Sequence, residues 1–310
     1  MNAATARLTR NAALASVSAA LLLGGLKGYA AWATGSVAML GSLADSALDL
    51  IASLVTLAGV HIAAQPADEK HRFGHGKAES LAALFQVALI TVSALVILIR
   101  AIQRMGEGAE TANAEYGIAV SVIAIAVTLA LTAYQAHVVR LTRSVAIGAD
   151  RVHYMSDLLL NLAVIAALVL DQWLGLSGAD PVFGIAIAAW LLFGAFRASS
   201  HAIDQLMDKE WPQEKRRRFV QVASAHPQLK NLHDLRTRTS GNRDFVQFHM
   251  WMDPKLTVLE AHDIVESIEH ALAAEFPDTE ILIHIDPEGR VDDPGNDLVE
   301  ADEIARLKEH

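Results

Sequence analysis

Six apolar runs occupy the first two thirds of the chain and constrain its fold more than any other feature. They cover residues of about 12–33, 37–64, 79–103, 115–138, 147–170 and 181–206. As a helix rising about 1.5 Å per residue, each run is long enough to cross the ~30 Å hydrocarbon core of a membrane. The chain is also 53% hydrophobic, which is too apolar for an ordinary soluble protein of 310 residues. We therefore predict a membrane domain of six helices.

The first run is open to a second interpretation. Arg7 and Arg10 precede it and an Ala-rich segment lies further on, as in a secretory signal. Because several more runs follow at once, we interpret it as a retained helix.

Lysine and arginine concentrate in the loops on one side of six alternating helices. This bias predicts that both termini are cytoplasmic.

Two of the apolar runs carry ionisable residues spaced by four. Asp45 and Asp49 lie in the second run, and His153 and Asp157 lie in the fifth. Residues four apart project from one face of a helix. An ionisable group in a membrane costs at least about 2.5–3.5 kcal/mol on insertion scales, so a functional role is the default interpretation. The two pairs offer four oxygen or nitrogen ligands, and they predict a divalent metal site within the membrane.

Both pairs fall at the same predicted depth. The second run starts outside near Val37, which places its pair about 12–18 Å below the outer face. The fifth starts at the cytoplasmic side near Ile147, which places its pair about 15–21 Å below that face in a ~30 Å core. The alternative is a structural polar cluster satisfied by Ser42, Ser46, Ser156 or Asn161. Three carboxylates and an imidazole would repel one another unless protonated or metal-bound, so we favour the metal site.

Other ionisable residues lie in or near the runs: Lys27, His61, His137 and His201. We interpret them as helix-end or packed residues, with Lys27 paired or reaching toward the polar surface. Asp150 lies one turn before His153, near the cytoplasmic end of its run, and we expect it to be solvated.

The loop between the second and third runs contains a smaller cluster. Asp68, His71 and His75 follow one another at intervals of three and four. This spacing suits a metal ion bound by a short loop. A charged membrane loop commonly carries histidine, so a purely solvated loop remains the alternative.

The polar remainder of the chain has the pattern of a small α+β domain. We predict a helix at 213–225, strands at 232–240, 245–252 and 281–286, and a second helix that ends near 276. A turn at Gly241-Asn242 separates the first two strands, and Thr257 and Glu260 form a capping box that opens the second helix. The predicted order is αββαβ.

The histidines of this domain predict a second metal site. His284 and Asp286 are two apart on a strand and therefore share one face. His233, His249 and His262 lie on the other predicted elements. An aspartate with several histidines suits one or two ions like Zn²⁺. The alternative is surface histidines, which we accept for His226 and His270.

Cysteine is absent from the sequence, and the net charge is −10. Disulfides and thiolate metal sites are therefore excluded, which argues against Cu(I) as the dedicated cargo. The last 24 residues hold eight acidic side chains against three basic ones. We divide the chain into a membrane domain at 1–209, a cytoplasmic domain at 210–288 and a disordered acidic tail at 289–310.

Seven segments make the chain similar to the cation diffusion facilitator family, and closest to its bacterial ferrous-iron and zinc efflux type. They are GSVAMLGSLADSALD, QPADEKHRFGHGKAESLAAL, ADRVHYMSDLLLN, HDLRTRTSG, FVQFHM, EAH and IHIDP. The resemblance covers about residues 10–288. It implies a homodimer in the bacterial inner membrane that exports divalent metal in exchange for protons, and it implies neither an enzyme nor a nucleic-acid partner.

The resemblance also implies roles for individual residues. The transport site would be Asp45, Asp49, His153 and Asp157, the loop site Asp68, His71 and His75, and a binuclear soluble site His233, His249, His262, His284 and Asp286. Lys77 would pair with Asp208 and lock the dimer. One departure is Ile285, because close relatives carry a polar residue there. The segment KRRR at 215–218 is particular to this chain, and we interpret it as solvated or facing lipid headgroups.

We expect alternating access around the membrane site, with metal displacing protons from imidazole and carboxylate ligands. The ligand set places Zn²⁺ first as cargo, followed by Fe²⁺ and Cd²⁺. A passive divalent-metal channel and a membrane-bound metal sensor are the alternatives. An intramembrane metalloprotease is disfavoured because the sequence contains no HExxH motif.

Overall fold

We analysed a computed structural model of the chain, which divides into two compact units, one up to Ile203 and one from Asp204 onward. The structure describes residues 3–34, 37–105, 115–174, 179–241, 243–289 and 303–304.

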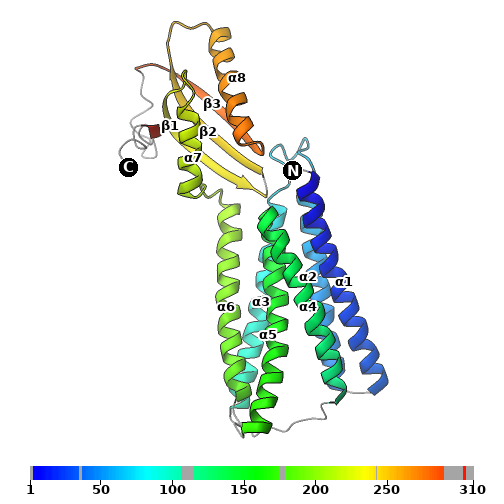
Figure 1. Ribbon diagram of the computed structural model, residues 1–310. Coiled ribbons are helices and arrows are strands. Elements are labelled where there is room, and N and C mark those ends of the chain that lie inside the picture. Colours follow the sequence, from blue (N-terminus) through cyan, green and yellow to red (C-terminus); the bar gives the residue numbers. More distant parts are fainter. Residues whose placement is uncertain are drawn as a thin grey trace. The chain divides into compact units, whose positions relative to one another are not determined.

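The first unit consists of long helices that run side by side (Figure 1). They are α1 (Ala3–Thr34), α2 (Val37–Ala63), α3 (Ala78–Arg104), α4 (Glu115–Thr142), α5 (Val145–Leu174) and α6 (Ala179–Leu206). Each coincides with a predicted apolar run, although α1 begins well before the predicted start at residue 12. The prediction of six long helices is confirmed.

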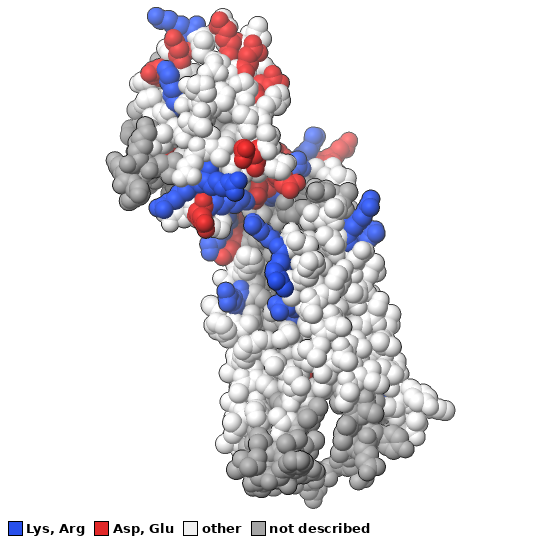
Figure 2. Space-filling model, viewed as in Figure 1, with Lys and Arg blue, Asp and Glu red and all other residues white. Residues whose placement is uncertain are grey.

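Length and composition qualify five of these helices as membrane spans: α1, α2, α3, α4 and α6. The remaining helix, α5, is 30 residues long and carries Asp150, Arg151 and Asp157 in its first half. The visible face of this unit is nearly free of charged side chains away from one end, whereas Lys, Arg, Asp and Glu gather over the other unit (Figure 2). This distribution is that of a membrane domain joined to a water-exposed domain.

The helices of the membrane unit pack through small residues. Helix α1 packs against α2 and α4, and α5 packs against α3 and α4. At Gly59 of α2, an added Cβ atom would lie 2.5 Å from the Ala82 Cβ atom of α3. At Gly184 of α6, it would lie 2.9 Å from the Ala101 Cβ atom. Small residues at such crossings let helix backbones approach closely, which is a principal source of association between helices in lipid.

The second unit has the predicted αββαβ order. Its elements are α7 (Gln213–Ser224), β1 (Lys230–Ser240), β2 (Arg243–Met252), α8 (Val258–Glu275) and β3 (Thr279–Pro287). The sheet order is β1-β2-β3, with β1 antiparallel and β3 parallel to β2. The core contains Phe219 of α7, Phe248 of β2 and Leu272 of α8. The capping box of Thr257 and Glu260 is present.

Two residues of the predicted acidic tail contact this domain. Glu303 Oε1 lies 3.3 Å from Arg216 Nη2, and Ile304 packs against the hydrophobic core. The Arg216 side chain also lies 3.7 Å from Glu210. The expectation that the KRRR segment is solvated or faces lipid is therefore wrong for Arg216, because acidic side chains of its own domain cover it. The other residues of the tail after Gly289 lie outside the described part of the chain.

The close approach at Gly59 makes a prediction for stability. We expect Gly59→Ala to lower the thermal unfolding temperature of the detergent-purified protein, because the new methyl group meets Ala82 and the Ala78 carbonyl, 3.2 Å away. Overpacking of this kind costs typically about 1–3 kcal/mol. The control is Gly25→Ala, whose Cβ meets nothing within 4 Å. It should be neutral or stabilising, because alanine is the better helix former. Equal stabilisation by both changes would contradict the packing described for α2 and α3.

Candidate metal sites

A group of three metal-binding side chains lies inside the membrane unit. Asp49 of α2 and His153 and Asp157 of α5 each offer one ligand atom, and these atoms lie within 4.8 Å of one another. The His153 Nε2 atom is 3.0 Å from Asp49 Oδ1. His153 Nδ1 is buried and has no hydrogen-bond partner among the described residues. Two helices far apart in sequence thus meet at the predicted residues.

Asp45, the fourth predicted ligand, is not in this group. It lies one turn before Asp49 on α2, is exposed, and interacts electrostatically with Asp157. Its place in the transport site stays a prediction.

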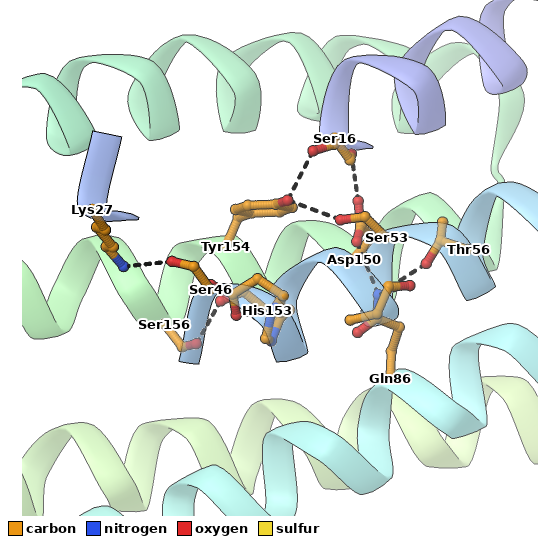
Figure 3. A network of polar contacts seen from close by, with 12 residues as sticks. Ser16, Lys27, Ser46, Ser53, Thr56, Gln86, Asp150, His153, Tyr154 and Ser156 are labelled. Atoms are coloured by element: carbon orange, nitrogen blue, oxygen red, sulfur yellow. Dashed lines mark hydrogen bonds and ion pairs between the residues drawn. The ribbon is translucent and has the colours of Figure 1, made fainter. Parts of the chain in front are cut away.

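Among the described side chains, Ser46, Ser156 and Asn161 do not bond to the ligand atoms of this group. Lys27 Nζ donates to Ser46 Oγ at 2.8 Å, as Figure 3 shows, so Lys27 is paired as predicted. Ser156 donates to the His153 carbonyl and Asn161 to the Asp157 carbonyl. These contacts are with backbone or with Lys27, and none of them involves the carboxylates or the imidazole of the group. They weaken the alternative of a polar cluster for Ser46, Ser156 and Asn161, whereas the side chain of Ser42 lies outside the described part of the structure.

The predicted loop group also comes together. His71 Nδ1 lies 3.1 Å from both Asp68 Oδ1 and His75 Nε2. Backbone N–H groups of His71 and Lys70 donate to the Asp68 carboxylate and hold the pKa of Asp68 below its usual value. The carboxylate is therefore ionised and oriented at neutral pH, and can bind a cation beside two imidazoles.

In the second unit, the sheet register brings a third group together. His233 lies opposite His249 in the β1–β2 pair, and His249 lies beside His284 in the β2–β3 pair. Asp286 Oδ2 is 2.9 Å from His249 Nδ1 and 3.3 Å from His233 Nε2, and Asp286 Oδ1 is 3.4 Å from His284 Nε2. One carboxylate thus contacts an imidazole from each strand. His262 is exposed on α8 and lies outside the three-residue group of His233, His249 and Asp286.

Asp234 is an acidic residue of this group that sequence reasoning missed. Its side chain is buried, and Oδ2 lies 3.6 Å from His249 Nε2 and 2.9 Å from Arg236 Nη2. In a regular strand, Asp234 would point away from the face of His233. The β1 strand is instead irregular on both sides of His233, and Asp234 has a positive φ of 46°. Nothing in the sequence HDLRTR announces this bulge.

The expectation that Asp150 is solvated is wrong. Asp150 is fully buried and accepts hydrogen bonds from Ser16 Oγ, Gln86 Nε2 and Gln135 Nε2 at 2.6, 2.9 and 2.7 Å. Three other helices thus enclose the N-terminal part of α5. His61, His137 and His201 are exposed, so they are not packed residues, and His61 lies in the last turn of α2, as expected of a helix-end residue.

A second buried carboxylate, Glu79, was also missed. Ser144 Oγ donates to Glu79 Oε2 at 2.5 Å, and the backbone N–H groups of Val145 and Ala146 bond to the same side chain. Glu79 of α3 therefore caps the first turn of α5, which is the helix that carries His153 and Asp157. It also lies one turn after His75 of the loop group. Its partners are some 65 residues away in sequence, so no local pattern could reveal this contact.

Matches to known proteins cover most of the chain. Residues 13–207 match the family description "Cation efflux transmembrane domain", and residues 211–288 match "Cation efflux protein, cytoplasmic domain". The cation-efflux pump FieF of Cronobacter sakazakii is 44% identical over 93% of this chain and 95% of its own length. FieF of Serratia proteamaculans is 44% identical over 91% of this chain and 94% of its own. The metal-bound C-terminal domain of the CzcD transporter from Thermotoga maritima is 26% identical over 26% of this chain and 99% of its own, with a TM-score of 0.25.

The capping contact of Glu79 can be tested by its effect on stability. We expect Glu79→Ala to reduce the free energy of unfolding by about 1–2 kcal/mol, the scale of a lost helix cap. Thermal unfolding in detergent measures the change, with Glu69→Ala in the exposed loop as the control. If both variants were as stable as the parent, the cap would contribute nothing.

Proposed function

The chain belongs to the cation diffusion facilitator family, and from that premise we propose that it exports divalent metal ions in exchange for protons. Its relatives are cation-efflux pumps, and it is a multi-pass protein of the bacterial inner membrane. The observation that carries the proposal is the convergence of Asp49, His153 and Asp157 inside the membrane unit.

The donor set favours Zn²⁺ as the first cargo, followed by Fe²⁺ and Cd²⁺. Two carboxylates and an imidazole place one ligand atom each within 4.8 Å of one another, and Asp45 would add a third carboxylate. Zn²⁺ accepts tetrahedral sets of nitrogen and oxygen ligands. Carboxylates are harder ligands than imidazole, so a site with two carboxylates can also bind Fe²⁺.

Proton exchange follows from the chemistry of the same ligands. A bound divalent ion requires neutral imidazole and ionised carboxylates, so metal binding releases protons. His153 Nε2 lies 3.0 Å from Asp49 Oδ1, so a proton can be held between these two ligand atoms. When the site opens to the more acidic outside, protons compete for these atoms and displace the metal. Alternating access of this single site then couples the two fluxes.

We further propose that two protomers pair through the cytoplasmic unit, with both termini in the cytoplasm and with a Lys77–Asp208 pair that locks the dimer. The soluble group at Asp286, together with His262, would support or regulate this pairing. The loop group at Asp68 would bind an accessory ion near the start of α3.

Transport by purified protein in sealed proteoliposomes tests the proposal. Under an imposed pH gradient we expect Zn²⁺ uptake, and weaker Fe²⁺ uptake, which Asp157→Ala or Asp45→Ala abolishes. The physical reason is the loss of a membrane ligand that no neighbouring side chain replaces. Flux that ignores the pH gradient would identify a channel, and tight binding to the soluble unit without flux would identify a sensor.

Asp286→Ala provides the matched control on the soluble group. It removes the carboxylate that contacts three imidazoles, and we expect it to weaken dimer pairing or regulation while transport continues. If it stopped transport as completely as Asp157→Ala, this division of roles would be wrong.

The charge pair of the dimer makes a separate prediction. We expect Lys77→Asp or Asp208→Lys alone to reduce the dimer fraction measured by light scattering, and the double variant to restore it. The control is Lys209→Asp, because Lys209 is exposed and pairs with Asp204 of its own chain at 2.6 Å. A double variant whose dimer fraction is as low as that of the single variants would exclude the pair. An effect of Asp208→Lys alone would then come from the loss of its contact with Arg238, 3.5 Å away in the same chain.

A further inference from the structure

The most unusual group in the membrane unit outside the proposed ligands is Asp150. Its carboxylate is fully buried, one turn before His153 on α5. Figure 3 shows it at the centre of a polar network, with the transport histidine beside it on the same helix. Burying an isolated carboxylate in an apolar medium is costly, so the position of Asp150 needs a physical explanation.

The direct partners of Asp150 are neutral donors. The hydroxyl of Ser16 and the side-chain amides of Gln86 and Gln135 all point at its two oxygens. Burial opposes the ionised form of this carboxylate, and three donors on its two oxygens counter that effect, because an ionised carboxylate accepts several hydrogen bonds at once.

A second layer of contacts holds these donors in place. Gln86 Nε2 also donates to the Ala52 carbonyl and to Thr56 Oγ1 of α2. Tyr154 donates to the Ser16 carbonyl and accepts from Ser53. The network therefore draws on α1, α2, α3, α4 and α5, and the carboxylate cannot easily turn away from its position.

No cation neutralises this carboxylate locally. Among the residues that the structure describes, no Lys, Arg or His nitrogen lies within ion-pair distance of Asp150, and Arg151 Nε donates instead to the Thr132 carbonyl. The charged groups that act on it electrostatically are His153 and Asp49 of the transport group. Asp150 is itself absent from the group of converging ligand atoms.

We propose that Asp150 is a fixed anion that raises the affinity of the Asp49, His153 and Asp157 group for divalent cations without ligating them. This inference rests on the proposed transport function and assigns Asp150 as a positioning residue of that site. The network supplies the structural means, because neutral donors hold the charge in place without cancelling it. A cation bound at the transport group, one helical turn away on α5, would be attracted by that charge.

The size of the effect can be bounded. Neighbours three apart on a helix are separated by roughly 6 Å. At an effective dielectric constant of about 20, the attraction between unit charges at that distance corresponds to roughly 100-fold in affinity. We expect Asp150→Asn to raise the KM for Zn²⁺ transport by about 10- to 100-fold, with a smaller change in the maximal rate.

Three variants separate the charge of Asp150 from its structural contacts. Ser16→Ala removes one hydrogen bond and keeps the charge, so its KM should stay within about threefold of the parent. Glu79→Gln neutralises another buried carboxylate that is bonded to neutral donors at the first turn of α5, and it should likewise leave the KM unchanged. The double variant Asp150→Asn/Gln135→Glu returns a negative charge to the same pocket and should restore the KM to within about threefold.

Zn²⁺ uptake is measured for all variants in the same proteoliposomes, with Asp157→Ala as the inactive reference. If Asp157→Ala abolishes uptake but Asp150→Asn has the KM of Ser16→Ala, the network is only structural and the inference is overturned. If Asp150→Asn does not fold, the double variant decides: a KM near that of the parent supports the fixed charge, and a tenfold increase overturns it. Uptake that survives Asp157→Ala would instead overturn the proposed function itself.

Discussion

The burial of ionisable side chains in α5 is the constraint on which the membrane unit depends. This helix carries Asp150, His153 and Asp157 within two turns, and Asp150 and His153 are buried against polar partners, as such groups require. The partners come from every helix from α1 to α4, together with the capping carboxylate Glu79 of α3. Helix α5 is therefore held by polar contacts at its first turn and twice more along its length. The surrounding helices owe their arrangement to these contacts as well as to close packing at small residues.

The three candidate metal groups share a chemical design but differ in how they are held. Each combines aspartate with imidazole, which suits borderline divalent ions better than Mg²⁺ or Cu(I). The membrane group joins two helices and the sheet group joins three strands, and each has one buried and two half-buried residues, whereas the loop group is local and mostly exposed. A cation at the exposed loop would compete with water, whereas the membrane group lies on helices that cross the apolar part of the bilayer. Uncompensated charge is therefore most costly at the membrane group, and the neighbouring carboxylate of Asp150 contributes to the charge there.

Sequence reasoning succeeded where periodicity and spacing act locally, and it failed where a fold brings distant residues together. The four-residue spacing of Asp45 and Asp49 correctly placed both on one helix, yet only Asp49 reaches the histidine. The alternation of β1 correctly predicted the face of His233 but put Asp234 on the opposite face. A bulge with positive φ at Asp234 instead turns its carboxylate toward His249. Position along the helix predicted a solvated Asp150, since nothing local shows that Ser16 and two glutamines converge on it.

The sequence by itself determined the six long helices, the αββαβ order, the family and the residue types at each metal group. Apolar length, strand alternation and ligand spacing are properties of neighbouring residues, and they are readable before any folding. Tertiary structure alone decided which candidate ligands meet, how Glu79 caps a helix it does not belong to, and why a buried aspartate lies beside the membrane metal group. These features depend on contacts between residues 60 to 140 positions apart, whose geometry is set only when the helices pack.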